Sequence, residues 1–366
     1  MKIKTITCHD VYNVGASLQA YALQQYLTDC GHEVEIIDYK PDYLSRQYNL
    51  ASVDNPKYDV PVIREAYLIA KFPRRLKARR SERKKNFDIF RNDYLRLTRR
   101  YNSFSELQRI PPIADVYFAG SDQIWNPLFK NGRDPSFYLA FAPKEKVRAS
   151  YAASFATDQI SDEDKLLMKP LLSGLDAISV REKSALITLN EMGLQGKEVC
   201  DPVFLLSPLV WRKIALSQGI DESVFMYDFD DSELIQKVAA RVAEDKGTDI
   251  VSFFPTRIYA KVADNMGPRE FLGAILESDV IVSNSFHATA FAIMFHKEFF
   301  VINRKENLNT RMCDLLEKVG LSERLIWSIS DLDNVHPIDW KLVDKRLEQQ
   351  KSVSVAYIAD VLKIKK

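Results

Sequence analysis

Short apolar segments typical of β-strands alternate with longer helical segments along almost the whole chain. Near the N-terminus "KIKTITC" is followed by "ASLQAYALQQYLTDCG" and then by "EVEIIDY". The alternation returns in a second set that starts at "SVFMYDF" and ends at "FFVIN". Strands that alternate with helices favour parallel sheets covered by helices. The sequence therefore predicts an α/β fold built from doubly wound, Rossmann-like units.

The length of the chain favours two such units. Its 366 residues exceed what one hydrophobic core usually serves. The first alternating series ends at Asp201 and Pro202, which predicts a boundary within about 201–207. We expect an N-terminal Rossmann-like domain over 1–205, with a basic helical insertion at about 61–110, and a C-terminal Rossmann-like domain over 206–338. For residues 339–366 the sequence predicts a long polar helix that packs back on the first domain.

Composition narrows the class of protein. The net charge of +1 gives no support to nucleic-acid binding, and the four cysteines form no CxxC pair, so neither a disulfide framework nor a metal site is expected. The N-terminus lacks the apolar core of a signal peptide, and no apolar run reaches the roughly 18 residues of a membrane span. We expect a cytoplasmic protein.

A basic segment at 73–100 carries twelve Lys or Arg against three Asp or Glu. Phe87, Phe90, Tyr94 and Leu97 recur within it at helical spacing, which predicts an amphipathic helix with a core-facing side. The charges either coat a solvated helix face or dock the protein peripherally on the anionic cytoplasmic leaflet of the inner membrane.

The clearest candidate site lies in "DVIVSNSFHATAFAIMF", where an apolar strand runs into an apolar helix. The first turn of that helix has unpaired N–H groups and the positive end of the helix dipole, so it attracts phosphate or carboxylate. Asn284 or Ser285 would cap it, and His287 would bind phosphate or transfer a proton. The alternative is an ordinary cap with a structural histidine.

Three further polar clusters follow predicted strands. The first loop, "CHDVYNVGASLQAYAL", offers Asn13, Gly15 and Gln19 and lacks the GxGxxG of a dinucleotide site; turn and cap chemistry is the alternative. Arg181 in "AISVREKSA" has the planar fork that suits carboxylate or phosphate, and a surface ion pair is the alternative.

The third cluster is "AGSDQIWNP", whose composition suits a polar ligand such as a sugar. In this interpretation Trp125 offers a flat apolar face and Asp122 accepts hydrogen bonds from hydroxyls. The alternative interpretation of the same residues is a capped turn with a tryptophan in the core. The candidate residues in this segment are Ser121, Asp122, Gln123, Trp125 and Asn126.

Five of these segments, taken in order, resemble the polysaccharide pyruvyl transferase family. They are "YNVGASLQAYAL", "AGSDQIWNP", "ISVREKSA", "DPVFLL" and "SNSFHATAFAIMF", and the resemblance spans about residues 2–320. It implies a two-domain, GT-B-like arrangement with the site in the inter-domain cleft. It also implies transfer of a pyruvyl group from phosphoenolpyruvate onto two hydroxyls of a sugar, which gives a cyclic ketal and phosphate. Because nothing in the sequence resembles a metal site, we expect the reaction to need no metal and no cofactor.

The resemblance also assigns residues. His287 matches the family's histidine, which is associated with phosphoenolpyruvate, and Arg181 matches an arginine linked to the same ligand. Arg311 in "NTRMCDLLEKVG" resembles a further family arginine, with a helix-surface charge as the alternative. Where better understood ketal-forming members have Arg-Leu-His, this chain has Ser285, Phe286 and His287. The donor must then be held by Arg181, Arg311 or a backbone amide.

In the mechanism that this implies, His287 binds phosphate and acts as acid or base, and Asp122 orients the acceptor or acts as base. The acceptor sugar is lipid-linked, nucleotide-linked or polymeric. Two alternatives remain: a GT-B glycosyltransferase that uses a nucleotide sugar, and a non-catalytic sugar-binding protein of the same fold.

Overall fold

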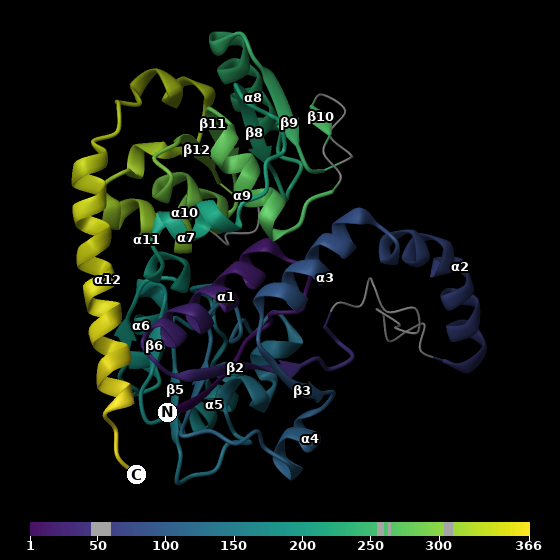
Figure 1. The fold of residues 1–366 in the computed structure, drawn as a ribbon, viewed down its shortest axis with the longest axis vertical. Coiled ribbons are helices and arrows are strands. Elements are labelled where there is room, and N and C mark those ends of the chain that lie inside the picture. Colours follow the sequence, from purple (N-terminus) through teal and green to yellow (C-terminus); the bar gives the residue numbers. More distant parts are fainter. Residues whose placement is uncertain (45–59, 255–259, 263–264, 304–309) are drawn as a thin grey trace.

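The structure, a computed structural model, describes residues 1–44, 60–254, 260–262, 265–303 and 310–366. Two parallel sheets, each flanked by helices, lie one above the other along the long axis of the molecule (Figure 1). The predicted α/β fold with two Rossmann-like domains is confirmed.

The N-terminal sheet has the strand order β3-β2-β1-β4-β5, and its pairings are parallel. A short pair, β6 and β7, continues it through bridges of Ala149 with Ala177 and of Ala153 with Val180. The strands are β1 (Lys2–Ile6), β2 (Glu33–Tyr39), β3 (Leu97–Tyr101), β4 (Val116–Ala119), β5 (Val147–Ser150), β6 (Ser179–Val180) and β7 (Lys197–Glu198). Its helices are α1 (Val14–Asp29), α2 (Pro61–Arg79), α3 (Glu82–Tyr94), α4 (Phe104–Arg109), α5 (Asp162–Leu172) and α6 (Lys183–Glu191).

The C-terminal sheet has the order β10-β9-β8-β11-β12-β13 and is also parallel. Its strands are β8 (Ser223–Tyr227), β9 (Asp249–Ser252), β10 (Lys261–Val262), β11 (Val280–Ser283), β12 (Glu298–Ile302) and β13 (Leu325–Ile326). The helices of this half are α7 (Pro208–Ile214), α8 (Glu233–Lys246), α9 (Pro268–Glu277), α10 (Phe286–Met294) and α11 (Thr310–Val319), followed by α12 (Trp340–Leu362).

Strand order changes direction once in each sheet, between β1 and β4 and between β8 and β11. In open α/β sheets such switch points leave a crevice beyond the carboxyl ends of the strands, where ligands bind. The loops that the sequence singled out after β1, β4 and β11 are therefore the loops at the two switch points.

The basic segment differs in part from the sequence prediction. Phe87 and Phe90 form the buried side of α3, as expected. Leu97 does not extend that helix, because the chain leaves it at Leu95 and enters β3, which pairs with β2. The sequence of β3, LTRRY, is too polar to stand out as a strand, yet it suits the edge of a sheet, where charged side chains reach water.

Apolar packing joins the two halves. Trp211 of α7 is fully buried, and its ring meets Tyr21 of α1 at 5.7 Å and Phe291 of α10 at 5.1 Å between centroids. One cluster of buried hydrophobic residues accordingly includes side chains from both sheets. The relation between the two sheets is thus fixed by a shared core.

Helix α12 runs along the side of both halves (Figure 1). At its start, Trp340 stacks on His296 of the C-terminal half. Further along, the Tyr357 hydroxyl donates to the carbonyl of Ser150 at 2.8 Å, and Ser354 Oγ accepts from the amide of Cys200 at 2.8 Å. Among the described helices none is long and apolar enough to cross a membrane.

Candidate active site

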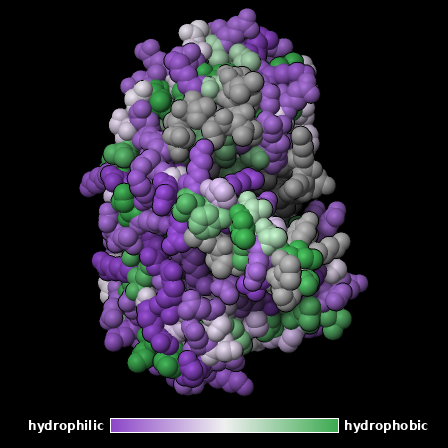
Figure 2. All heavy atoms as spheres, turned by 90° about the vertical axis from the view of Figure 1, so that its right-hand side faces the viewer, coloured by the Kyte–Doolittle hydropathy of each residue, from purple (hydrophilic) through white to green (hydrophobic). Residues whose placement is uncertain are grey.

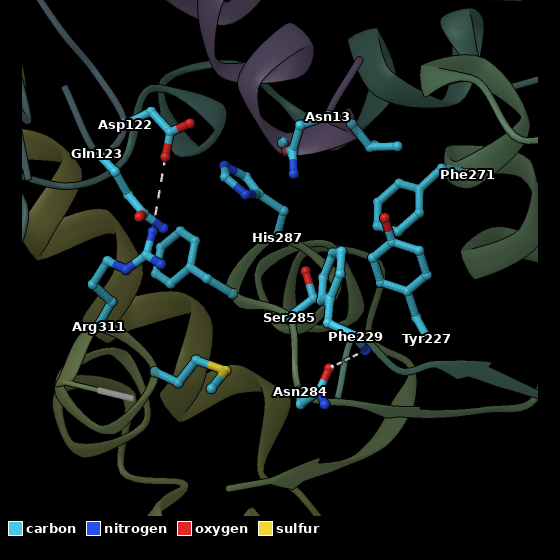
Figure 3. Close-up of a pocket in the computed structure, with 14 residues that line it drawn as sticks. Asn13, Asp122, Gln123, Tyr227, Phe229, Phe271, Asn284, Ser285, His287 and Arg311 are labelled. Carbon is cyan, nitrogen blue, oxygen red and sulfur yellow. Dashed lines mark hydrogen bonds and ion pairs between the residues drawn. The ribbon is translucent and has the colours of Figure 1, made fainter. Parts of the chain in front are cut away.

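A cavity of about 250 Å³ lies between the carboxyl ends of the two sheets. Figure 3 shows side chains from both halves pointing into it. The N-terminal half contributes the loops after β1 and β4 and the first turn of α1. The C-terminal half contributes the ends of β8 and β11, the first turn of α10 and parts of α9 and α11. The described residues that line it are Asn13, Val14, Gly15, Asp122, Gln123, Tyr227, Phe229, Phe271, Asn284, Ser285, Phe286, His287, Arg311 and Met312.

Two helices begin at this cavity. Asn13 caps α1, its Oδ1 accepting from the amide of Ala16 at 3.1 Å. Ser285 caps α10, its Oγ accepting from the amide of Ala288 at 3.4 Å. First-turn residues of both helices line the cavity, so unpaired amides and the positive ends of two helix dipoles meet there. Such a place favours an anionic ligand.

His287 stands between these two helix ends. Its side chain is 9% exposed, and its ring packs directly on Gly15 of α1. A Cβ at position 15 would overlap the imidazole. Glycine is therefore required here by the close approach of the ring and not by the backbone angles of a turn.

A buried carboxylate lies behind the histidine. Asp201 Oδ2 is 3.7 Å from His287 Nε2 and also accepts a hydrogen bond from Arg181 Nη1, while Oδ1 accepts from the amide of Val203 at 3.1 Å. Burial alone would raise the pKa of Asp201, but the charge of Arg181, the nearby His287 and the hydrogen bond from the amide of Val203 outweigh it and hold that pKa well below its ordinary value. The carboxylate is thus ionised and faces the imidazole.

The two arginines occupy different places. Arg181 lies behind the cavity wall, with its guanidinium 4.7 Å from the centroid of the Phe286 ring and Nη2 3.5 Å from Asp122 Oδ1. Burial would lower the pKa of Arg181, yet Asp201 and Asp122 raise it above its usual value. Arg311 lines the cavity itself, and its Nη1 is 3.8 Å from Asp122 Oδ1 (Figure 3). Asp122 therefore sits between two cations.

A family model with the description polysaccharide pyruvyl transferase matches residues 13–306. The chain belongs to this family. It is accordingly a transferase, and the suspected resemblance is confirmed. No curated protein sequence matches the chain.

Solved structures show the same fold at low sequence identity. A UDP-N-acetylglucosamine 2-epimerase matches with a TM-score of 0.55 and 9% identity, over 100% of this chain and 97% of that one. The Neisseria meningitidis UDP-GlcNAc 2-epimerase bound to UDP-GlcNAc matches with 0.51 and 8%, over 99% of each chain. S. aureus MnaA, solved with UDP, matches with 0.50 and 12%, over 100% and 98%. These are GT-B-type proteins, and the likeness concerns the fold alone.

Ser285 and Phe286, which replace the Arg-Leu of the family's Arg-Leu-His, have defined places in the structure. Ser285 stands where those family members have arginine, and it serves as the cap of α10. Phe286 follows it, and its ring lies between Arg181 and Arg311, whose Cζ atoms are 4.7 and 5.9 Å from its centroid. Arg311 is 7% exposed, so the alternative of a helix-surface charge is wrong. Arg311 is the one arginine among the described residues that line the cavity.

Asn284 and an aromatic group form the wall on the C-terminal side. Asn284 Oδ1 accepts from the amide of Phe229 at 3.0 Å, and its Nδ2 donates to Asp228 Oδ1 at 2.9 Å, so the carboxamide orders the loop after β8. The Tyr227 ring lies 4.9 Å from Phe229 and 5.1 Å from Phe271, between centroids. Sequence reasoning missed this group, because Tyr227 and Phe229 look like ordinary strand residues in "SVFMYDF".

Five of the predicted site residues lie behind the cavity wall and do not line it: Arg181, Gln19, Ser121, Trp125 and Asn126. Gln19 Oε1 accepts from the amide of Ser121 at 3.1 Å, which ties α1 to the loop after β4. Trp125 is fully buried, stacks on Tyr138 and donates its indole N–H to the carbonyl of Phe137 at 3.0 Å. It has no free face for a sugar, in contrast to the predicted role.

Gln123, by contrast, reaches the cavity. Asn126 Nδ2 donates to Gln123 Oε1 at 3.1 Å and so orients that side chain. Beside it, Asp122 has φ of +74°, a left-handed backbone conformation that is costly for aspartate and is often retained at functional sites.

Within the described part of the chain no group of three or more His, Cys, Asp and Glu side chains is placed to hold a metal ion. The charged groups of the cavity pair with one another instead.

Proposed function

We propose that this family member transfers a pyruvyl group from phosphoenolpyruvate onto two hydroxyls of a sugar in a polysaccharide precursor, forming a cyclic ketal and releasing phosphate. One observation carries the proposal. Two helix N-termini, Arg311 and a carboxylate-backed His287 converge on a single cavity at the switch points of both sheets. Phosphoenolpyruvate is small and bears two anionic groups, which this arrangement complements.

The donor's anionic groups are assigned to the positive part of the cavity. Arg311 and the first-turn amides of α1 and α10 hold the carboxylate and the phosphate. Arg311 would then bind the donor in place of the arginine that precedes the histidine in family members with Arg-Leu-His. Arg181 acts indirectly, because it holds Asp201 and Asp122 in place from behind the wall.

The reaction needs one proton at the methylene carbon and the loss of two hydroxyl protons. Protonation of the methylene makes a methyl group and leaves the central carbon electrophilic. The first sugar hydroxyl adds to that carbon and gives up its proton. The second hydroxyl replaces the phosphate, which leaves with its bridging oxygen, and closes the ring. His287, backed by the Asp201 carboxylate, exchanges the proton beside the phosphate, and Asp122 orients or deprotonates the acceptor.

The acceptor side is the N-terminal half, where Asp122 and Gln123 face the cavity. Carboxylate and carboxamide groups suit the hydroxyls of a sugar. We propose a lipid-linked or nucleotide-linked precursor as acceptor.

Calorimetric titration tests the donor. Phosphoenolpyruvate is expected to bind the wild type, and Arg311→Ala and His287→Ala are expected to weaken it. UDP and inorganic phosphate are the comparison ligands. The control variant is Arg109→Ala, because Arg109 lies on α4 and does not line the cavity. Absence of phosphoenolpyruvate binding at millimolar ligand, together with clear UDP binding, would overturn the proposal in favour of a nucleotide-sugar glycosyltransferase.

Turnover gives a second test. Replacing a positioned proton donor typically lowers the rate by about 100- to 10,000-fold, so His287→Ala should lower phosphate release by that order. The melting temperature should change little, since the imidazole lies at a cavity. A melting temperature that falls as steeply as the activity would mark His287 as structural.

A further inference from the structure

Helix α2 stands apart from the rest of the fold. It spans 19 residues, Pro61–Arg79, and projects from the side of the N-terminal half (Figure 1). Pro73 lies inside it and divides an apolar first part from a strongly basic second part.

The first part of α2 exposes an apolar face. Ile63 is 48% exposed and Ile69 is 73% exposed, and Phe72 in the next turn is 46% exposed. Ala66 and Ala70 lie between Ile63 and Ile69 around the helix and are also exposed, whereas Phe72, nine residues after Ile63, points to the opposite side from Ile63. Figure 2, which looks onto this side of the molecule, shows green apolar atoms set among purple polar ones.

The charge of the helix has one dominant sign. Residues 60–80 contain seven Lys or Arg and one acidic residue, Glu65. Arg74, Lys77, Arg79 and Arg80 are exposed. An apolar face bordered by basic residues complements a surface with an apolar interior and an anionic boundary.

We propose that α2 docks the protein on an anionic lipid bilayer. The helix lies in the plane of the interface, with Ile63 and Ile69 inserted at the level of the acyl boundary and the basic residues on lipid phosphates. Amphipathic helices with Lys and Arg on the polar side bind membranes in this way. Charge complementarity favours this partner over a second copy of the chain, which would bring two basic helices together.

The docking helix is connected to the cavity. Helix α3 follows α2 directly, and Arg83 Nη2 of α3 donates to the carbonyl of Tyr12 at 2.8 Å. Tyr12 precedes Asn13, the cap of α1 that lines the cavity. On the C-terminal side, Asn86 Nδ2 donates to the carbonyl of Asn265 at 2.6 Å. If the proposed function holds, docking brings the cavity to a surface that carries lipid-linked acceptors.

Vesicle flotation tests the docking without reference to catalysis. Wild-type protein should float with vesicles of equal parts phosphatidylglycerol and phosphatidylcholine, less with phosphatidylcholine alone, and less as salt is added. Ile63→Asp/Ile69→Asp should weaken binding at least about tenfold, because it removes apolar burial. Leu166→Asp on α5 is the matched control, since Leu166 is 75% exposed.

The charge contribution has its own pair of variants. Lys77→Gln/Arg80→Gln should weaken binding about thirtyfold, at about 1 kcal/mol per basic residue. Lys341→Gln/Lys345→Gln removes two exposed charges from α12, on the other side of the molecule, and should leave binding unchanged. Circular dichroism confirms that each variant is folded.

Two results would overturn the docking. One is wild-type protein that stays with the buffer at millimolar anionic lipid. The other is binding that Ile63→Asp/Ile69→Asp leaves intact. A wild type that is dimeric by light scattering and becomes monomeric in that variant, without vesicle binding, would make the face a contact between two copies. Phosphoenolpyruvate binding is measured separately, so loss of the docking hypothesis and loss of the proposed function are distinguishable.

Discussion

At the scale of single residues, the cavity depends on how closely backbone and side chains approach His287. Gly15→Ala places a methyl group where the imidazole lies, so the ring must move away from the cavity. We expect this substitution to lower turnover nearly as much as His287→Ala, although residue 15 has no functional group.

A double-mutant cycle checks that reason. In Gly15→Ala/His287→Ala the clash is gone, so the double variant should be no slower than His287→Ala alone. Turnover that falls by the product of the two single effects would show that Gly15 acts by another route.

Asp201 gives a prediction on pH. Because its pKa is lowered in the folded protein, the unfolded state binds its proton more readily, and stability rises with pH in that range. The contribution is complete above the unfolded pKa of about 3.9 and is lost as pH falls from there toward the folded pKa. Asp201→Asn should cost about 3–5 kcal/mol near neutral pH, since Arg181 loses a buried partner.

Urea unfolding of wild type and Asp201→Asn, at about pH 7 and about pH 3, measures this difference. The gap in the free energy of unfolding should narrow at the lower pH. A gap that is the same at both values would mean that the pKa of Asp201 is the same in the folded and the unfolded protein. The sequence does not single out Asp201 as a site residue, because an Asp-Pro pair after a short strand is typical of a turn at a domain boundary.

At the scale of elements, the caps of α1 and α10 set the polarity of the cavity. Asn13→Ala removes the hydrogen bond from Ala16 and should cost about 0.5–2 kcal/mol of stability. It should also weaken phosphoenolpyruvate binding, because the first turn of α1 loses its order beside the ligand.

Ser161→Ala is the matched control. Ser161 caps α5, where its side chain accepts from the amide of Asp164 at 3.1 Å, and α5 does not line the cavity. Both variants should lose similar stability as measured by urea unfolding, while calorimetry should show weaker binding only for Asn13→Ala. If the two variants bind phosphoenolpyruvate equally well, the N-terminus of α1 is not part of the anion site.

Elements also explain what sequence alone could and could not predict. Apolar strands followed by polar loops indicate the correct edge of each sheet. The sequence therefore predicts that His287, Asn13 and Asp122 belong to one site, and all three line the cavity. The same pattern could not tell which side chains of a loop turn inward. Trp125 and Gln123 are two positions apart, yet one fills the core and the other lines the cavity. Arg181 and Arg311 differ in the same way, since long-range packing decides that Arg311 lines the cavity and Arg181 lies behind its wall.

At the scale of the whole molecule, the cavity exists because a common core holds the carboxyl ends of the two sheets towards each other. Trp211 lies at the centre of that contact, fully buried between Tyr21 of α1 and Phe291 of α10, with its indole N–H donated to the carbonyl of Val203 at 3.1 Å. Side chains on both sides of the cavity therefore depend on it, although Trp211 does not line the cavity.

Trp211→Ala should cost about 3–5 kcal/mol, the usual range for removing a large buried aromatic side chain. Trp327→Ala is the control, since Trp327 is 63% exposed and its loss should change stability by about 0.5 kcal/mol or less. Denaturant unfolding followed by circular dichroism measures both. Because the two halves share one core, Trp211→Ala should also weaken phosphoenolpyruvate binding, as α1 and α10 no longer hold their first turns at a fixed separation. A variant that loses this stability and still binds phosphoenolpyruvate like the wild type would show that one half alone holds the donor.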